Sequence, residues 1–411
     1  MSDVFAELVG QDEAVDTLRR VAHAAADLVR AAAGGGPAAP AGGAGRPAPS
    51  ASAMTHAWIF TGPPGSGRTT AARAFAAALQ CVHGTGCGDC PGCHTTLAGT
   101  HADVRFVVPE GLSLGVGEMR ALVLRAASTP AGGRWQVVVV TDADRLTEAA
   151  GNALLKAVEE PPPRTVFLLC TPSTHPDDIS VTIRSRCRVV ALRQPPVDAV
   201  AAVLRDRDGV PAETAAWAAA AAQGDIGQAR LLSGDPQARS RREAVLAVPR
   251  RLTGVGAAFE AASALIEAAE ADAAASVAET DASERAALET ALGAGGTGRG
   301  AAGAMRGAAG QLKELERRQK SRATRAQRDA LDRALVDLAG FYRDVLAVAM
   351  GAPVQPVHTD VAAAARAAAG KWRAEGALRR LEAVLECRTA IEANVKPRIA
   401  VEAMMLALWR G

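Results

Sequence analysis

Residues Gly62–Thr69 read G-P-P-G-S-G-R-T, and this short stretch decides the fold. It follows the pattern G-x-x-x-x-G-K-[ST], in which glycines let backbone N–H groups surround phosphates, a lysine reaches the β- and γ-phosphates, and the hydroxyl binds Mg²⁺. Here Arg68 replaces the lysine; it keeps the positive charge, but its guanidinium is planar and bulkier. The stretch therefore predicts a phosphate-binding P-loop, while the arginine argues against hydrolysis. The candidate nucleotide-binding residues of the loop are Gly62, Gly65, Gly67, Arg68, Thr69 and Thr70.

Strands and helices alternate on both sides of this loop. A strand at 56–61 leads into it and a helix at 68–80 follows, which is the context that a P-loop requires. Residues 137–141 form an unbroken apolar run, typical of a parallel strand that is covered on both faces. The alternation predicts an α/β domain with a parallel sheet and helices on both faces. Further strands are expected at 104–108, 166–170 and 188–192, and further helices at 12–33, 116–127 and 146–158.

After Gln194 the pattern predicts helices only. We predict three domains: an α/β P-loop domain at 1–194, a small helical lid at 195–238 and an all-helical C-terminal domain at 239–411. Segments rich in Ala and Gly are expected to be flexible at 33–53, which also contains Pro and Ser, and at about 293–310. The last helix is expected to carry an apolar stripe formed by Val401, Met404, Met405 and Leu408, with Pro397 in its first turn.

The composition of the 411 residues narrows the class of protein. A net charge of +2 is too small to indicate nucleic-acid binding by itself. No apolar run is long enough to span a bilayer and no N-terminal stretch is typical of a signal peptide, so we expect a cytoplasmic protein with no membrane partner. Basic residues are almost all arginine, which offers a second origin for Arg68, namely drift from lysine under a biased composition. Either origin argues against a working ATPase.

The strand at 137–141 is followed by a carboxylate. Asp142 stands where a P-loop NTPase places the aspartate that helps to hold Mg²⁺. The next residue is Ala143, where ATPases of the AAA+ type place a glutamate that polarises the attacking water. Asp144 could take over that role, or it could be a polar residue at the start of a helix. Together with Arg68, Ala143 predicts a chain without ATPase activity of its own that could still bind ATP or ADP with Mg²⁺.

Four cysteines follow the helix after the P-loop with the spacing C-x5-C-x2-C-x2-C: Cys81, Cys87, Cys90 and Cys93. In a cytoplasmic chain, four thiols in so short a stretch predict a tetrahedral structural zinc site within a module at 81–97. Disulfides and incidental cysteines are the alternatives, and a reducing compartment disfavours disulfides. His83 and His94 could substitute as ligands, but four cysteines already complete the site.

Arg186 lies in the sequence Ser185-Arg186-Cys187, after a short helix. Such an arginine commonly forms a weak surface ion pair. It can also be an arginine finger, which reaches the γ-phosphate bound by a neighbouring subunit and contributes about 10³–10⁵ in rate. Composition does not separate these two interpretations.

Together these motifs resemble the clamp-loader branch of the AAA+ ATPases. The resemblance covers the first 230 residues and, less closely, the last helix. It implies that Thr171 is the sensor-1 residue, that Arg230 belongs to the sensor-2 segment, and that Arg186 is an arginine finger acting in trans. It also implies that the C-terminal domain is a collar that holds subunits in a ring. Besides the P-loop, the cysteines and S-R-C, the matching stretches are F-x-x-L-V-G-Q at 5–11, N-A-L-L-K-A-V-E-E-P-P at 152–162, G-D-I-G-Q-A-R at 224–230 and N-V-K-P-R-I-A-V-E at 394–402.

Two kinds of clamp-loader subunit are candidates. The gamma/tau motor keeps the P-loop lysine and the glutamate after the aspartate, whereas the delta-prime type has a degraded ATP site and keeps the S-R-C finger. Arg68 and Ala143 favour the delta-prime type of DNA polymerase III. Its partners would be gamma/tau and delta subunits in a hetero-pentameric ring, and through the ring the sliding clamp and primed DNA. A third candidate is a stand-alone zinc protein that binds nucleic acid, but the chain has little of the aromatic content that such a surface needs.

Overall fold

The computed structural model describes residues 3–32, 34, 54–109, 111–132, 134–291 and 301–411, which form two compact units. The first unit comprises the described residues of Met1–Pro109, Ser113–Gly209 and Gly224–Gln228. The second comprises those of Glu110–Leu112, Val210–Gln223 and Ala229–Gly411. Apart from Gly34, the segment at 33–53 that was expected to be flexible lies outside the described residues. Because the two units cut across the lid expected at 195–238, the three-domain division stays a prediction.

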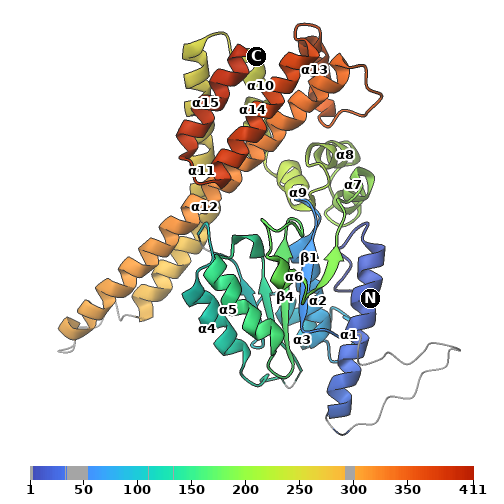
Figure 1. Cartoon of the computed structure of the whole chain (residues 1–411), viewed down its shortest axis with the longest axis vertical. Helices are drawn as coiled ribbons and strands as arrows, with labels where there is room; N and C mark the ends of the chain where they lie inside the picture. The colour runs from blue at the N-terminus through green and yellow to red at the C-terminus, as the bar shows by residue number, and fades with distance from the viewer. Residues whose placement is uncertain (1–2, 33, 35–53, 110, 133, 292–300) are drawn as a thin grey trace, which may run out of the picture. The chain divides into compact units, whose positions relative to one another are not determined.

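A five-stranded parallel sheet forms the centre of the first unit (Figure 1). The strands lie in the order β2-β3-β4-β1-β5, so the strand that leads into the P-loop lies between two others. Parallel neighbours need crossover connections, which the intervening helices provide. The predicted α/β class with a parallel sheet is therefore confirmed. The strands are β1 (Ala57–Thr61), β2 (Val104–Val107), β3 (Gln136–Val140), β4 (Thr165–Thr171) and β5 (Arg188–Ala191).

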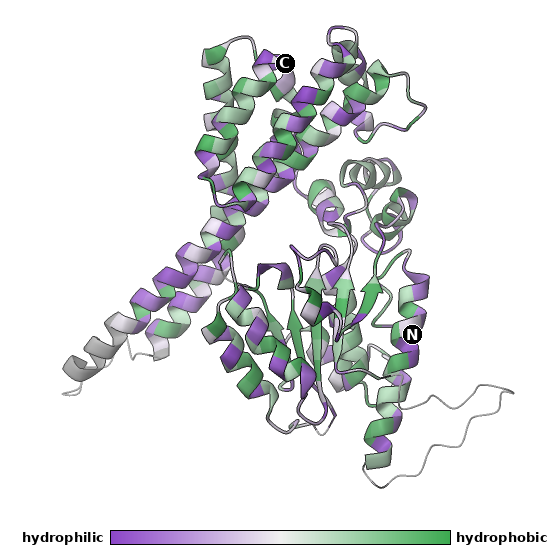
Figure 2. Cartoon of the chain, viewed as in Figure 1, coloured by the Kyte–Doolittle hydropathy of each residue, from purple (hydrophilic) through white to green (hydrophobic). Residues whose placement is uncertain are grey.

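The sheet separates two hydrophobic cores. Successive side chains of a strand point to opposite faces. In β1, Trp58 and Phe60 join a core with α1 (Asp12–Ala32) and α2 (Arg68–Gln80). Ala57 and Ile59 join another core with α4 (Val116–Ala126) and α5 (Glu148–Glu159). The three central strands are buried along their whole length, which explains their continuous apolar sequences. In Figure 2 these strands stand out as a green band.

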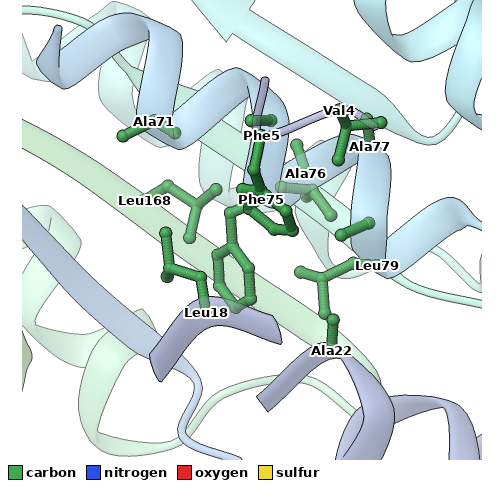
Figure 3. Close-up of a cluster of buried hydrophobic side chains, with 14 of the residues drawn as sticks. Val4, Phe5, Leu18, Ala22, Ala71, Phe75, Ala76, Ala77, Leu79 and Leu168 are labelled. Atoms are coloured by element: carbon green, nitrogen blue, oxygen red, sulfur yellow. The ribbon is translucent and has the colours of Figure 1, made fainter. Parts of the chain in front are cut away.

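Phe75 of α2 lies within the first core, surrounded by side chains from α1, α2 and the sheet (Figure 3). It is fully buried, and its ring meets Trp58 edge-on with the ring centroids 5.2 Å apart. Leu18 and Leu168 approach it from α1 and β4. The helices of this unit are α1 (Asp12–Ala32), α2 (Arg68–Gln80), α3 (Pro91–Leu97), α4 (Val116–Ala126), α5 (Glu148–Glu159), α6 (Val181–Arg184) and α7 (Val197–Asp206).

In the residues that the structure describes, the second unit is built from helices and the segments that connect them. Apolar faces of α11, α12, α14 and α15 meet in one core, which includes the four residues of the stripe predicted in the last helix. Among the described residues, none of the helices combines the length and the apolar character needed to cross a membrane. The helices are α8 (Ala212–Ala221), α9 (Ile226–Gly234, whose first residues belong to the first unit), α10 (Pro236–Arg251), α11 (Val255–Ala291), α12 (Ala301–Ala349), α13 (Ala362–Ala369), α14 (Ala374–Glu392) and α15 (Pro397–Arg410).

Residues 301–310 differ from their prediction as part of a flexible loop. They form the first turns of α12, which begins at Ala301. Residues 301–309 include five alanines, and alanine has the highest helix propensity, so these residues can extend the helix despite their glycines. Residues 293–300 of the same expected loop lie outside the described residues.

A buried ionic network joins α10 and α12 of the second unit to the segment before α13. Arg242 is 4% exposed; it pairs with Asp360, and its Nη2 lies 2.9 Å from Nδ1 of His358. Its Nε lies 3.5 Å from the carboxylate of Asp337. Asp344 accepts a hydrogen bond of 2.9 Å from the backbone N–H of His358. Burial raises the pKa of Asp337 to about 6, although the charge of Arg242 opposes this. Burial lowers the pKa of His358, and the charge of Arg242 lowers it further.

Candidate functional site

The P-loop lies where β1 ends and α2 begins. Gly65 and Gly67 have φ values of 79° and 82°, in the left-handed region that favours glycine. A Cβ atom at Gly65 would lie 2.8 Å from the side chain of Asp225. One at Gly62 would lie 2.5 Å from the carbonyl oxygen of Leu192. The backbone path of the loop therefore requires glycine at all three positions.

This loop leaves backbone donors available to a ligand. Among the described residues, none accepts a hydrogen bond from the backbone N–H groups of Gly65, Gly67, Arg68 and Thr69. The loop also opens α2, a helix of 13 residues whose N-terminus carries partial positive charge. Unpaired N–H groups at a helix N-terminus form an anion-binding site. The arrangement therefore fits a phosphate group.

The Arg68 side chain folds back onto the loop itself. Its Nη1 donates a hydrogen bond of 2.7 Å to the carbonyl oxygen of Gly62. In the standard motif the lysine at this position extends to the β- and γ-phosphates. The substitution therefore changes the partner of the side chain as well as its shape, because the charged group is engaged by the protein backbone.

Two carboxylates follow β3 near the loop. Asp142 precedes a 3₁₀ turn, η2 (Ala143–Arg145), and the side chain of Ala143 is buried in the core below the sheet. Burial raises the pKa of Asp144; the charge of Asp142 adds to this effect, and the charges of Arg145 and Arg68 oppose it. The residue that caps the next helix is Thr147, whose hydroxyl accepts a hydrogen bond of 3.3 Å from the N–H of Ala150. Asp144 is therefore not the polar residue that starts the helix, and it lies within electrostatic reach of Arg68.

Cys170 and Thr171 close β4 beside the loop. Burial raises the pKa of the Cys170 thiol to about 12, against the charge of Arg68 and a hydrogen bond with the Thr69 side chain. The hydroxyl of Thr171, the expected sensor-1 residue, donates to the carbonyl oxygen of Ser173 at 2.8 Å. Arg230, expected in the sensor-2 segment, lies on α9 in the second unit.

Gln11 is a contact of the loop that sequence reasoning missed. Its Nε2 donates to the carbonyl oxygen of Ser66 at 3.5 Å, and its Oε1 accepts from the backbone N–H of Arg193 at 3.1 Å. This buried side chain therefore links the N-terminal segment, the P-loop and the end of β5. The available signal was a polar residue at the end of the F-x-x-L-V-G-Q stretch.

The four cysteines of the expected zinc module come together in space. Their Sγ atoms all lie within 4.8 Å of one another, with Cys81 at 3.8 Å from Cys87 and 4.0 Å from Cys90. A tetrahedral ion with Zn–S bonds of about 2.3 Å holds its sulfur ligands about 3.8 Å apart. The four thiols lie close enough together for the cluster to hold a metal ion.

The electrostatics of the cluster favour a thiolate at one position. Burial opposes ionisation of Cys81, but backbone N–H groups outweigh it and lower the pKa of its thiol to about 5. Burial raises the pKa of Cys93. Metal ligands are thiolates, so a bound cation would have to offset this cost of burial. The module is also fixed to the N-terminal segment, because Val4 donates a backbone hydrogen bond of 3.0 Å to Gly86.

Arg186 lies in the turn after α6, at the surface of the first unit. Its Nη2 lies 2.8 Å from Oε1 of Glu159, the last residue of α5. Its Nη1 donates to the carbonyl oxygen of Thr182 at 2.9 Å and to the hydroxyl of Ser185 at 3.2 Å. The Arg186 side chain is 41% exposed, so a partner molecule can reach it. In the isolated chain Arg186 therefore forms a surface ion pair, and this contact is compatible with a role in trans.

The family model matches a segment that lies almost entirely in the first unit. Residues 48–196 match the family model described as DNA polymerase III, delta subunit. The delta' subunit of Escherichia coli DNA polymerase III is 38% identical over 195 residues, which are 43% of this chain and 57% of that protein. The tau/gamma subunit of Haemophilus influenzae is 33% identical over 210 residues, 49% of this chain and 30% of that protein. A gamma subunit-related protein from Thermotoga maritima covers 87% of this chain and 94% of its own, with 15% identity and a TM-score of 0.38, too loose a likeness to carry an argument.

A parallel sheet with a glycine loop that opens a helix, and a carboxylate after β3, defines the first unit as a P-loop domain. The described part of the second unit is mostly helical, so the predicted order of an α/β P-loop domain followed by helices is confirmed. Residues 48–196 of the chain are therefore similar to clamp-loader subunits of DNA polymerase III. The matches span 57% and 30% of the two relatives named above.

Proposed function

We propose that this chain is a delta-prime-type subunit of a DNA polymerase III clamp loader and does not hydrolyse ATP itself. The observation that carries the proposal is the state of the two hydrolytic positions. Arg68 bonds to the carbonyl oxygen of Gly62 where a lysine would extend to phosphate, and Ala143 offers no group to orient water. Phosphoryl transfer depends on positioning and charge stabilisation, so losing both groups removes most of the catalysis.

In this proposal Arg186 acts on ATP bound to a neighbouring gamma/tau subunit. Its exposed guanidinium can meet a γ-phosphate and stabilise the charge that develops during transfer. The partners of the chain would be gamma/tau and delta subunits in a five-membered ring. Through that ring, the chain would take part in placing the sliding clamp on primed DNA.

The same proposal assigns ligands to the two binding sites of the first unit. The four-cysteine cluster would hold one structural zinc ion, because the four thiols leave no open coordination position for catalysis. In the P-loop, the free N–H groups of Gly65, Gly67, Arg68 and Thr69 would bind the phosphates of ATP or ADP. Thr69 and Asp142 are the residues available to hold Mg²⁺.

The test is ATP turnover in a ring reconstituted with the cognate gamma/tau and delta subunits. The isolated chain should show no turnover. Arg186→Ala should leave folding and ring assembly intact and should strongly reduce the clamp-stimulated ATPase of the ring. Unchanged turnover with Arg186→Ala would contradict the role of this residue.

A gamma/tau-type motor is the alternative, and Asp144 is the observation that favours it. Its carboxyl group lies within electrostatic reach of both Asp142 and Arg68, so it is the group available to orient water in place of the missing glutamate. This alternative predicts steady ATP hydrolysis by the isolated chain that Asp142→Ala abolishes. The delta-prime proposal predicts no such activity.

A further inference from the structure

The partner of Arg186 is a feature that the proposed function does not explain. Glu159 and Arg186 come from different elements, α5 and the turn after α6, and meet at 2.8 Å. Both backbones are held by buried neighbours, since Val158 and Ile183 belong to the same core. α5 and α6 also pack against each other near Gly151, where a Cβ would make an ordinary contact of 3.6 Å with the Ile183 side chain. The geometry of the pair is therefore set by the packing of two fixed elements.

Glu159 does not serve the helix on which it lies. It is the last residue of α5, where the helix dipole presents partial negative charge. A carboxylate at this end is unfavourable unless a cation lies nearby. The guanidinium of Arg186 supplies that cation. The position of Glu159 is therefore explained by its ion pair with Arg186 and not by a contribution to helix stability.

The two terminal nitrogens of the Arg186 guanidinium have different partners. Nη1 is used by the carbonyl oxygen of Thr182 and the hydroxyl of Ser185. Nη2 meets only one carboxylate oxygen of Glu159 in the described part of the chain, and a guanidinium has five N–H donors in all. Donors therefore remain for a phosphate while the side chain is held. A long arginine loses substantial rotamer entropy when it is fixed, and contacts made in advance reduce the entropy lost on meeting a ligand.

We propose that Glu159 is a positioning residue for Arg186: it holds the guanidinium at the surface in the orientation in which it meets a phosphate of a nucleotide bound to a neighbouring subunit. This inference rests on the proposed function, because it assumes that Arg186 acts in trans. It adds a residue that contacts neither nucleotide nor Mg²⁺ and acts only through the arginine.

The experiment measures the clamp-stimulated ATPase of rings reconstituted with the full-length chain, as kcat and KM for ATP. Because an exposed ion pair is a weak interaction, Glu159→Ala should lower kcat about two- to fivefold at unchanged KM and unchanged ring assembly. Glu159→Gln keeps an oxygen acceptor and should retain most of the rate. The matched control is Glu160→Ala, which removes the adjacent exposed carboxylate and should leave kcat unchanged.

A double variant separates positioning from a structural role. If Glu159 acts through Arg186, Glu159→Ala should have no further effect in a chain that already carries Arg186→Ala. An equal fall in both backgrounds overturns the inference, and so does an unchanged or raised kcat with Glu159→Ala while Arg186→Ala still lowers it; a raised rate would mean that the pair restrains the arginine. No effect of Arg186→Ala overturns the proposed function first, and this inference with it.

Discussion

Replacing Arg242 with methionine should destabilise the second unit more than any surface substitution. The guanidinium is 4% exposed and faces the carboxylates of Asp337 and Asp360 together with the ring of His358. Methionine fills similar space without charge, so the carboxylates lose their cation in a largely buried site. Removing one partner of a buried ion pair costs about 3–5 kcal/mol. Asp360 retains 23% exposure of its side chain, which favours the lower end of that range.

The free energy of unfolding that Arg242→Met removes should depend on pH, and the direction of this dependence follows from Asp337. The pKa of the Asp337 carboxyl group is about 6 in the folded chain, above its ordinary value of 3.8. Between these two pH values the folded chain therefore keeps a proton that the unfolded chain releases. Its contribution therefore weakens stability as pH rises from about 4 to 6. Arg242 lowers this pKa, so its removal extends the window to higher pH. For each unit by which the substitution raises the pKa of Asp337, the variant should lose about 1.4 kcal/mol more unfolding free energy at pH 8 than at low pH.

The assay is urea unfolding of the full-length chain at pH 5.5 and pH 8.0, followed by far-UV circular dichroism and tryptophan fluorescence. The control is Arg241→Met on the same helix, because Arg241 is 32% exposed and pairs with Asp235 and Asp272 at the surface. That substitution should cost no more than about 1 kcal/mol. A loss below about 1 kcal/mol for Arg242→Met, or an equal loss at both pH values, would refute the reasoning.

Three further predictions concern the first unit. Phe75→Ala should destabilise it by about 3–5 kcal/mol in chemical denaturation because the ring is fully buried, whereas the control Phe259→Ala, at a position of the second unit that is 42% exposed, should change stability by about 0.5 kcal/mol or less. Gly65→Ala should cost about 1–3 kcal/mol and abolish binding of a fluorescent ADP analogue, because φ is 79° and the new methyl group meets a neighbouring side chain; unaltered binding would count against the proposed role of the loop backbone. Cys87→Ser should reduce the zinc content from one ion per chain and lower the thermal midpoint of the first unit, while Cys187→Ser, outside the cluster, should leave the zinc content unchanged; equal metal analyses for the two variants would exclude the proposed site.

Much of the first unit could be predicted because its signals are local. The helix after the P-loop was expected at 68–80 and occupies Arg68–Gln80, since the last glycine of the loop ends the turn directly before it. The central strands were visible as apolar runs because both faces of the sheet are covered. The prediction of a flexible loop was wrong for residues 301–310, which begin α12. The glycines there suggested a loop, whereas the alanines between them support a helix.

In the candidate site, too, some features could be predicted from the sequence and others depend on the tertiary structure. Sequence by itself determined the P-loop, the spacing of four cysteines and the loss of the lysine and the glutamate, because each is a matter of which residue stands at a fixed offset along the chain. Only the tertiary structure decided that Arg68 bonds to the carbonyl oxygen of Gly62, that Glu159 pairs with Arg186, and that Arg242 meets a carboxylate 118 positions away. The physical reason is that a side chain takes the direction that its neighbours in space allow, and those neighbours come from packed elements distant in the chain.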